Sequence, residues 1–325
     1  MPAPAPAMEI GGSHVTAALV DLATGLVVPG SSHRRSLHPS GSATELLGTI
    51  VACGRDLPAA AGQRWGVALP GPFDYDNGVG LFVGVGKFEA LYGADVRGPL
   101  MAGLPGPPGS VTFLNDADAF GWGEWVYGAA AGFERCVAVT LGTGIGSAFL
   151  AGGTVHQSGP GVPPEGRVDL LLIDGQPLED VVSTRAIERA YRARNGASAQ
   201  GTAEIAARAR AGDRDAAEVL SAAFRELGGA LRPWLKDFGA EALIVGGSMT
   251  GSWDLIGPAL LEGLGTDGPG SPRGLVVSVA SELEHAALLG AAAYAQGAQA
   301  AVEPPRERER PDQSQAQDGP RQDRP

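Results

Sequence analysis

The chain has 325 residues, of which 44% are hydrophobic and 18% charged, so it can bury the core of one large α/β domain or two medium lobes. Its formal net charge of −12 has the wrong sign for a protein that binds a nucleic-acid backbone. No apolar run approaches the roughly 20 residues that cross a bilayer. We therefore expect neither a nucleic-acid partner nor a membrane segment.

The two ends of the chain differ in composition from the rest. Residues 1–7 alternate Pro and Ala without the features of a signal peptide, and they indicate a disordered leader before a strand at Met8. Residues 302–325 have almost no apolar side chains and predict a disordered tail. Cys53 and Cys136 stand alone in apolar surroundings, which indicates a reduced, cytoplasmic protein.

The first half of the chain alternates predicted strands and helices. Met8–Ile10 and Val15–Val20 have the composition of strands, and the turn Gly11-Gly12-Ser13 lies between them. Apolar residues at helical spacing predict a helix over residues 44–57. Further strands are expected at 65–69 and 111–114, and a further helix at 119–131.

The second half begins with a similar pattern. Cys136–Leu141 predicts a strand that enters the turn Gly142–Gly146 and returns over 147–150, which we interpret as a duplication of the first unit. Ser183 and Asp213 predict the N-caps of two helices, and Pro233 predicts a kink or a break in the second. The remaining strands are expected at 242–245 and 275–280, and the remaining helices at 253–264 and 284–296. This alternation is typical of an α/β protein.

Three glycine turns follow predicted strands, at Gly11–Ser13, Gly142–Gly146 and Gly246–Ser248. Backbone N–H groups can converge on a phosphate where no Cβ intervenes. Each turn alone is equally consistent with an ordinary loop. The middle turn does not open a helix, which disfavours a Rossmann fingerprint, and no Lys-Ser/Thr pair follows it as in a P-loop.

Carboxylates lie beside two of the predicted strand ends. Glu9 precedes the first turn and could hold a hydrated Mg²⁺, although it could equally be an ordinary polar residue at a strand. Asn115 and Asp116 end a strand, where ligands bind in open α/β sheets, and Asp116 could accept the proton of an attacking hydroxyl. The alternative is that Asn115, Asp116 or Asp118 only caps the next helix.

Taken in order, these segments resemble the ROK family of bacterial sugar kinases, within the sugar kinase/Hsp70/actin-like fold. The resemblance spans residues 8 to about 297 and rests on Glu9–Asp21, Leu69–Asp74, Leu114–Asp118, Leu141–Ser147, Ile244–Ser248 and Leu288–Ala293. It implies an α/β protein of two RNase-H-like lobes. The implied lobes are residues 8–117 and 118–283, with a closing helix at 284–301 packed on the N-terminal lobe.

The resemblance also implies an enzyme, a carbohydrate kinase that uses ATP and Mg²⁺ to phosphorylate a primary hydroxyl of a hexose or a hexose-like substrate, with glucose as the default. It further implies a homodimer. Asp116 would be the general base, and Gly71, Asn115, Glu165 and Glu179 would bind the sugar together with it. The first turn (Gly11, Gly12, Ser13) would hold the transferred phosphate, and Glu9 would hold Mg²⁺ through water. Gly142, Thr143 and Gly144 would hold the β and γ phosphates, and Gly246 and Gly247 the adenosine side.

Several residues depart from the family pattern. Glu9 stands where the family usually has Asp, and Ser13-His14 stand where it has Thr-Lys. The family's sugar-binding Gly-Glu-x-Gly-His is represented by Pro164–Arg167, without the histidine, and its three zinc cysteines are absent, so we expect no zinc site. Two alternatives stay open: a kinase for an amino-hexose or a C7-cyclitol, and a catalytically silent sugar-binding regulator. Polyphosphate in place of ATP also stays open.

Overall fold

The computed structural model describes residues 3–265, 274–281 and 285–297, so the predicted C-terminal tail lies outside the described residues. The N-terminal lobe contains β1 (Ala5–Ile10), β2 (His14–Asp21), β3 (Leu26–Val27), β4 (His33–Ser36), α1 (Ala43–Arg55), β5 (Arg64–Leu69), β6 (Phe73–Asp74), β7 (Val79–Gly80), α2 (Arg97–Gly103) and β8 (Ser110–Asn115). The chain then crosses through α3 (Asp116–Tyr127) into the second lobe.

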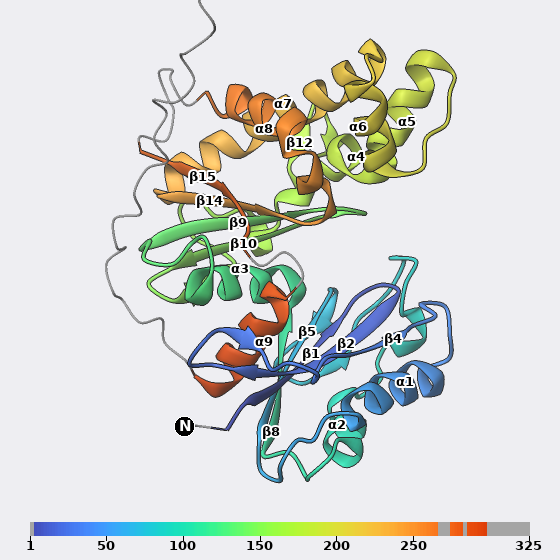
Figure 1. Cartoon of the computed structure of the whole chain (residues 1–325), viewed down its shortest axis with the longest axis vertical. Helices are drawn as coiled ribbons and strands as arrows, with labels where there is room; N and C mark the ends of the chain where they lie inside the picture. The colour runs from blue at the N-terminus through green and yellow to red at the C-terminus, as the bar shows by residue number, and fades with distance from the viewer. Residues whose placement is uncertain (1–2, 266–273, 282–284, 298–325) are drawn as a thin grey trace, which may run out of the picture.

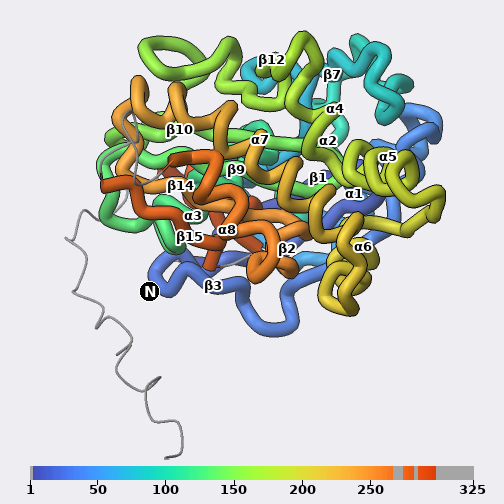
Figure 2. Tube along the Cα trace, turned by 90° about the horizontal axis from the view of Figure 1, so that it is seen from above, coloured from blue at the N-terminus to red at the C-terminus, as the bar shows by residue number. Residues whose placement is uncertain are grey.

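The C-terminal lobe is built around a second sheet and carries more helices. It contains β9 (Arg135–Leu141), β10 (Ile145–Ala151), β11 (Thr154–Val155), β12 (Leu172–Ile173), β13 (Gln176–Pro177), α4 (Glu179–Val182), α5 (Thr184–Asn195), α6 (Gly201–Arg210), α7 (Arg214–Phe238), β14 (Ala242–Gly246), α8 (Trp253–Leu264) and β15 (Val276–Val279). The last helix is α9 (Ala286–Gln296). Seen from above, α5 and α6 lie at one end of the molecule, away from β14 and β15 (Figure 2).

The two large sheets share the same strand order, apart from β4, which pairs with β2 in the first sheet only. Their strand orders are β3-β2-β1-β5-β8 and β11-β10-β9-β14-β15, each with antiparallel strands followed by two parallel strands. In the first, β1 pairs antiparallel with β2 and parallel with β5; in the second, β9 pairs antiparallel with β10 and parallel with β14. This confirms the predicted α/β fold of two RNase-H-like lobes, and it fits a duplication of one unit.

Helices α3 and α9 lie between the two sheets (Figure 1), with α3 against β9 and β10 and α9 against β1 and β5. Glycines allow the backbones to touch. A Cβ on Gly66 of β5 would lie 1.9 Å from the carbonyl oxygen of Ala291, and a Cβ on Gly290 would lie 1.8 Å from that of Ala119. The close packing of α9 on both α3 and β5 therefore fixes α3 relative to the N-terminal sheet, and α3 begins with Asp116 of the candidate site.

The prediction of a disordered leader over residues 1–7 is wrong for residues 5–7. Strand β1 begins at Ala5, and its residues pair in register with β2, for example Ala5 with Val20 and Ala7 with Ala18. Ala5 and Ala7 are buried in the core between the sheets. Alanine is small enough to fill this space, a property that the alternating Pro-Ala pattern does not reveal.

The predicted kink or break at Pro233 does not divide the helix. Helix α7 is assigned as one element of 25 residues with Pro233 inside it. Leu231 and Leu235, on either side of the proline, are buried in the core of the C-terminal lobe. Packing of this apolar face offsets the lost hydrogen bond, which costs about 3 kcal/mol in a helix interior. Within the described residues, no helix combines the length and the apolar character needed to cross a membrane.

The contact of α9 with α3 predicts that Gly290→Ala destabilises the protein by about 1–3 kcal/mol, because the new methyl group has no space against the backbone of Ala119. The matched control is Gly229→Ala in α7, where nothing lies within 4 Å of the added Cβ. That variant should be more stable by about 0.5–1 kcal/mol, since alanine is the better helix former. Urea unfolding of both variants measures the difference, and an unchanged midpoint for Gly290→Ala would refute the packing argument.

Candidate active site

The candidate site lies at the carboxyl ends of the parallel strands β1, β5 and β8. In the sheet register, Glu9 on β1 pairs with Ala68 on β5, and Leu69 pairs with Asn115 on β8. The first glycine turn, Gly71 and Asp116 come directly after these strand ends. Because parallel strands end at the same edge of a sheet, segments that are far apart in the sequence meet there.

Helix α3 begins at Asp116, three residues before the predicted start, and Asn115 is its N-cap. Oδ1 of Asn115 accepts hydrogen bonds from the backbone N–H groups of Ala117 at 2.9 Å and Asp118 at 3.3 Å. The capping interpretation therefore applies to Asn115. Asp116 is instead the first residue of the helix, and its carboxylate accepts a bond from the N–H of Ala117 at 2.9 Å.

Tyr75 joins the candidate sugar-binding residues to one another. Nδ2 of Asn115 donates to the Tyr75 hydroxyl at 3.1 Å, and that hydroxyl donates to the carbonyl of Leu69 at 3.3 Å. The same hydroxyl lies 3.4 Å from where a Cβ on Gly71 would be, so a side chain at Gly71 would crowd it. Burial raises the pKa of Tyr75, and the hydroxyl stays a proton donor. No local sequence pattern marks Tyr75 as a site residue.

Glu9 and Asp116 bring two carboxyl groups close together. Burial, and next the neighbouring Asp116, raise the pKa of Glu9 to about 7. Burial also raises the pKa of Asp116, while the ammonium group of Lys87 opposes that rise. Burial and Asp116 likewise raise the pKa of Asp118 to about 7, against a 3.5 Å hydrogen bond from Gln157. Two carboxylates in this position favour a bound proton or a cation between them.

The second and third glycine turns lie side by side in the C-terminal lobe. A Cβ on Gly142 would lie 3.5 Å from the Ser248 hydroxyl, and Gly247, at φ 88°, packs against the backbone of Leu141. Thr184 holds the second turn in place, because its N–H and its hydroxyl both donate to the carbonyl of Gly142, at 3.0 and 2.8 Å.

Within these turns, the polar and small residues differ in exposure. Thr143 and Ser248 are exposed, Gly142, Gly144 and Gly247 are half-buried, and Gly246 is buried against Phe120. The accessible part of the third turn is therefore Gly247 and Ser248.

The second turn also touches the helix that carries Asp116. A Cβ on Gly146 would lie 2.9 Å from the Cβ of Ala117, the residue after Asp116. The start of β10 therefore packs directly on the first turn of α3. In the N-terminal lobe, the N–H of Gly11 donates to the carbonyl of His14 at 2.8 Å, which closes the first turn and leaves Gly12 and Ser13 exposed.

The two predicted sugar-binding glutamates occupy different surroundings. Glu179 is half-buried beside the second turn, where it accepts a hydrogen bond from the N–H of Ile145 at 3.3 Å and lies 3.7 Å from Arg185. The Glu165 side chain is 76% exposed, and its carboxylate lies 3.9 Å from the Arg167 guanidinium group. The structure therefore brings Glu179, but not Glu165, into contact with a glycine turn.

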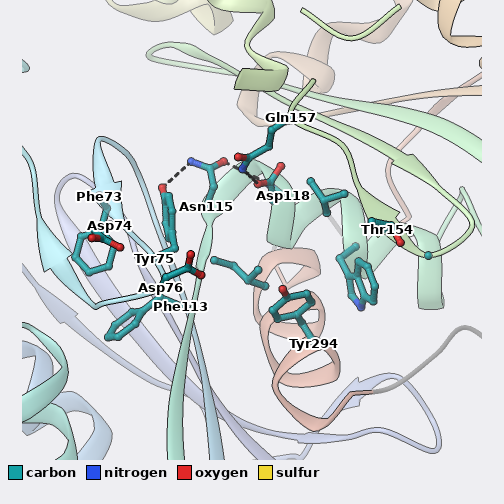
Figure 3. Close-up of a pocket in the computed structure, with 14 residues that line it drawn as sticks. Phe73, Asp74, Tyr75, Asp76, Phe113, Asn115, Asp118, Thr154, Gln157 and Tyr294 are labelled. Carbon is teal, nitrogen blue, oxygen red and sulfur yellow. Dashed lines mark hydrogen bonds between the residues drawn. The ribbon is translucent and has the colours of Figure 1, made fainter. Parts of the chain in front are cut away.

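A cavity of about 560 Å³ is lined in part by Tyr75, Asn115 and Asp118 (Figure 3). Tyr75 and Asn115 come from the N-terminal lobe, Asp118 from α3, Gln157 from the loop after β11, and Tyr294 from α9. Asp116 and the glycine turns do not line it, although Asn115 does. The cavity therefore borders Asn115 of the candidate sugar site, and the glycine turns lie outside its lining.

Within residues 3–265, 274–281 and 285–297, no group of three or more His, Cys, Asp and Glu side chains is arranged to hold a metal ion. The acidic pair of Glu9 and Asp116 is smaller than such a group. The Glu9 carboxylate alone suits Mg²⁺, which is usually held by one or two carboxylates together with water and substrate phosphates.

Comparisons with known proteins identify one family and similar sugar kinases. The model of the ROK family matches residues 6–298. A glucokinase from Thermotoga maritima is 28% identical over 250 residues, which are 70% of this chain and 77% of the relative.

Solved structures agree on the fold. A ROK family glucokinase from Streptomyces griseus, crystallised with glucose and AMPPNP, superposes with a TM-score of 0.73 at 23% identity and covers 90% of this chain and 99% of its own. An inorganic polyphosphate/ATP-glucomannokinase from Arthrobacter sp. strain KM gives a TM-score of 0.63 at 26% identity, and covers 91% of this chain and 99% of its own.

The raised pKa of Glu9 predicts a pH-dependent difference in stability. A carboxyl group whose pKa rises from 4.5 to about 7 on folding stabilises the protein fully below pH 4.5 and loses that contribution as the pH rises through 7. At pH 8 in EDTA, the free energy of unfolding of Glu9→Gln should therefore exceed that of the wild type by about 2 kcal/mol. At pH 4 the two proteins should be equally stable. Glu165→Gln, which removes an exposed carboxylate, should match the wild type in stability at both pH values. Identical denaturation curves for wild type and Glu9→Gln at pH 8 would contradict the burial of this group.

Proposed function

Because the chain belongs to the ROK family, we propose that it transfers the γ-phosphoryl group of ATP to the primary hydroxyl of a hexose, with glucose as the first substrate to test. It is a carbohydrate kinase with the sugar kinase/actin-like fold. The glucokinases among its relatives support glucose as the acceptor. A hexose-like polyol, an amino-hexose or a C7-cyclitol is the substrate to consider if hexoses fail.

The position of Asp116 is the observation that supports this proposal most. It is the first residue of α3, one residue after the strand end that carries Asn115, and its neighbour Ala117 packs against Gly146 of the second glycine turn. Asp116 in turn raises the pKa of Glu9, the residue that precedes the first glycine turn. A carboxylate between two phosphate-compatible turns suits a general base for phosphoryl transfer.

In this mechanism, Asp116 accepts the proton of the sugar hydroxyl while the hydroxyl oxygen forms a bond to the γ-phosphorus. The bond from the γ-phosphorus to the β–γ bridging oxygen breaks, and ADP leaves with that oxygen. A base is more effective when its pKa lies closer to the working pH, and the raised pKa of Asp116 has this direction. Burial thus makes this aspartate a stronger proton acceptor than an exposed one.

The sugar would bind among Asn115, Gly71 and Glu179, with Tyr75 as a further residue of the site. The hydrogen bonds from Asn115 to Tyr75 and from Tyr75 to Leu69 hold the Asn115 amide in one orientation. Because Gly71 has no side chain beside the Tyr75 hydroxyl, a ligand can approach the backbone there. Glu165 reaches the sugar in this proposal only through a movement of its exposed segment.

The phosphate groups of ATP would lie along the glycine turns. Gly142, Thr143 and Gly144 would bind the β and γ phosphates, Gly246 and Gly247 would lie on the adenosine side, and Gly11, Gly12 and Ser13 would receive the transferred group. Glu9 fits Mg²⁺ held through water, because its pKa is raised and, among the described residues, its carboxylate has neither a hydrogen-bond donor nor an ion pair. When bound, Mg²⁺ neutralises charge on the phosphate oxygens. The Arthrobacter relative makes polyphosphate a second donor to test.

The role of Asp116 predicts that Asp116→Asn lowers kcat by about 1,000-fold, within the 10²–10⁴-fold that general-base catalysis typically contributes. The KM for the sugar should change by only about 2-fold, since the amide keeps the shape of the side chain and one acceptor oxygen for the sugar hydroxyl. Coupled ADP release over a panel of hexoses, amino-hexoses and cyclitols measures both values.

Asp118→Asn is the matched control. It also removes a carboxyl group from the first turn of α3, but that carboxyl group faces Gln157. It should keep most of the activity. If the wild type is active and Asp116→Asn is equally active, Asp116 is not the general base. If the wild type binds sugar but releases no ADP with any substrate or donor, the kinase proposal fails and a silent sugar-binding protein is the better description.

A further inference from the structure

We propose that Lys87 is a catalytic residue that brings a positive charge to the first glycine turn, where its ammonium group binds the phosphoryl group during transfer to the substrate. The inference rests on the proposed function for the identity of the transferred group. Its basis is the place of Lys87 against Gly12, within electrostatic reach of Asp116, in a loop outside all three glycine turns.

The Lys87 side chain runs along the first turn. A Cβ added to Gly12 would lie 3.9 Å from Cδ of Lys87, so the aliphatic part of the lysine is in van der Waals range of the exposed glycine. From there the ammonium group influences the Asp116 carboxyl. Lys87 itself is half-buried. The side chain therefore joins the turn that would hold the phosphoryl group to the base that would accept the proton.

The residues around Lys87 hold it in this position. The ring of Phe88 is buried, 5.5 Å from the ring of Phe82, and the N–H of Phe88 donates to the carbonyl of Pro39 at 2.7 Å. On the other side, the N–H of Gly86 donates to the Glu89 carboxylate at 3.2 Å. These contacts hold the backbone before and after Lys87. Less conformational entropy is therefore lost when the lysine side chain binds a phosphate.

Other basic groups near the first turn do not fill this role. Arg34 on β4 is exposed, and it acts on Glu9 and His14 rather than on Asp116. Burial, and next the charge of Arg34, lower the pKa of His14, so this histidine is neutral near pH 7. Among the described residues Lys87 forms no ion pair with a carboxylate within 4.0 Å, so its ammonium group is available to a ligand.

The chemistry of the transferred group suits an ammonium ion. Charge spreads over the three equatorial oxygens as the bond from the hydroxyl oxygen forms and the bond to ADP breaks. A lysine presents three donors on a compact charge, and it stays protonated throughout while the hydroxyl proton passes to Asp116. Before the nucleotide binds, the same charge limits the repulsion between Asp116 and Glu9. After binding, it is shared between Asp116 and the phosphoryl oxygens.

Replacement of Lys87 tests the proposal in the purified full chain. Lys87→Met keeps the length of the side chain and removes the charge, and it should lower kcat by about 100-fold, as for loss of one preorganised donor. Lys87→Arg should recover a large part of that loss.

The sequence supplies a matched control, since Lys236 is its only other lysine and is exposed near the end of α7. Lys236→Met should behave as the wild type. If Lys87→Met and Lys87→Arg lose activity equally, the positive charge does not matter, Lys87 has only a structural role and the proposal is wrong. Wild-type activity in Lys87→Met would also overturn it, while leaving the kinase function in place.

A second measurement does not depend on turnover. Reductive methylation of the wild-type protein, read by mass spectrometry, follows Lys87 and Lys236 separately. AMP-PNP with Mg²⁺ and glucose, at concentrations at which calorimetry shows the nucleotide bound, should slow methylation of Lys87 at least about 10-fold and leave Lys236 unchanged. Equal methylation of Lys87 with and without bound nucleotide overturns the proposal. Protection in a protein that phosphorylates no sugar would support the place of Lys87 at the phosphate while refuting the kinase function.

Discussion

The candidate active site depends on one constraint: the fold holds the carboxyl groups of Glu9 and Asp116 near each other. They come from strand ends that the parallel register of β1, β5 and β8 places at one edge of the sheet. Burial raises the pKa of both groups, and their mutual repulsion adds to the rise for Glu9. The negative charge is opposed from outside the pair by Arg34, which acts on Glu9, and by Lys87, which acts on Asp116. In the proposed complex, Mg²⁺ would add to this compensation. The position of α3 maintains this arrangement, and α9 holds α3 through glycine contacts.

Much of the fold could be predicted because its signals are local. The glycine turn between β1 and β2 and the caps Ser183 and Asp213 depend on neighbouring residues, and all of them appear in the structure. The errors have tertiary causes. Ala5 joins β1 because the core between the sheets accepts its methyl group, and α7 continues past Pro233 because its apolar face is buried. Helix α6 was missed because most of its apolar residues are alanines, which give a weak helical pattern.

The candidate site was predicted in part, for a similar reason. The glycine turns, Asn115 and Asp116 can be found from strand ends and from the order of motifs along the chain. Tyr75 could not be found, since its bond to Asn115 joins residues 40 positions apart. The partnership of Lys87 with Gly12 and Asp116 likewise joins distant segments, and a lone lysine in a glycine-rich loop carries no signal of its own. The exposed position of Glu165 follows from the local chain path, which the sequence pattern does not define.

The most direct test of this account is a crystal structure of the wild-type protein with AMP-PNP, Mg²⁺ and glucose. We expect the β and γ phosphates along Gly142–Gly144, the terminal phosphate within reach of the first glycine turn, and a primary hydroxyl of glucose within hydrogen-bond distance of the Asp116 carboxylate. Density for the nucleotide elsewhere, with these turns free of ligand and Asp116 facing no sugar oxygen, would contradict it.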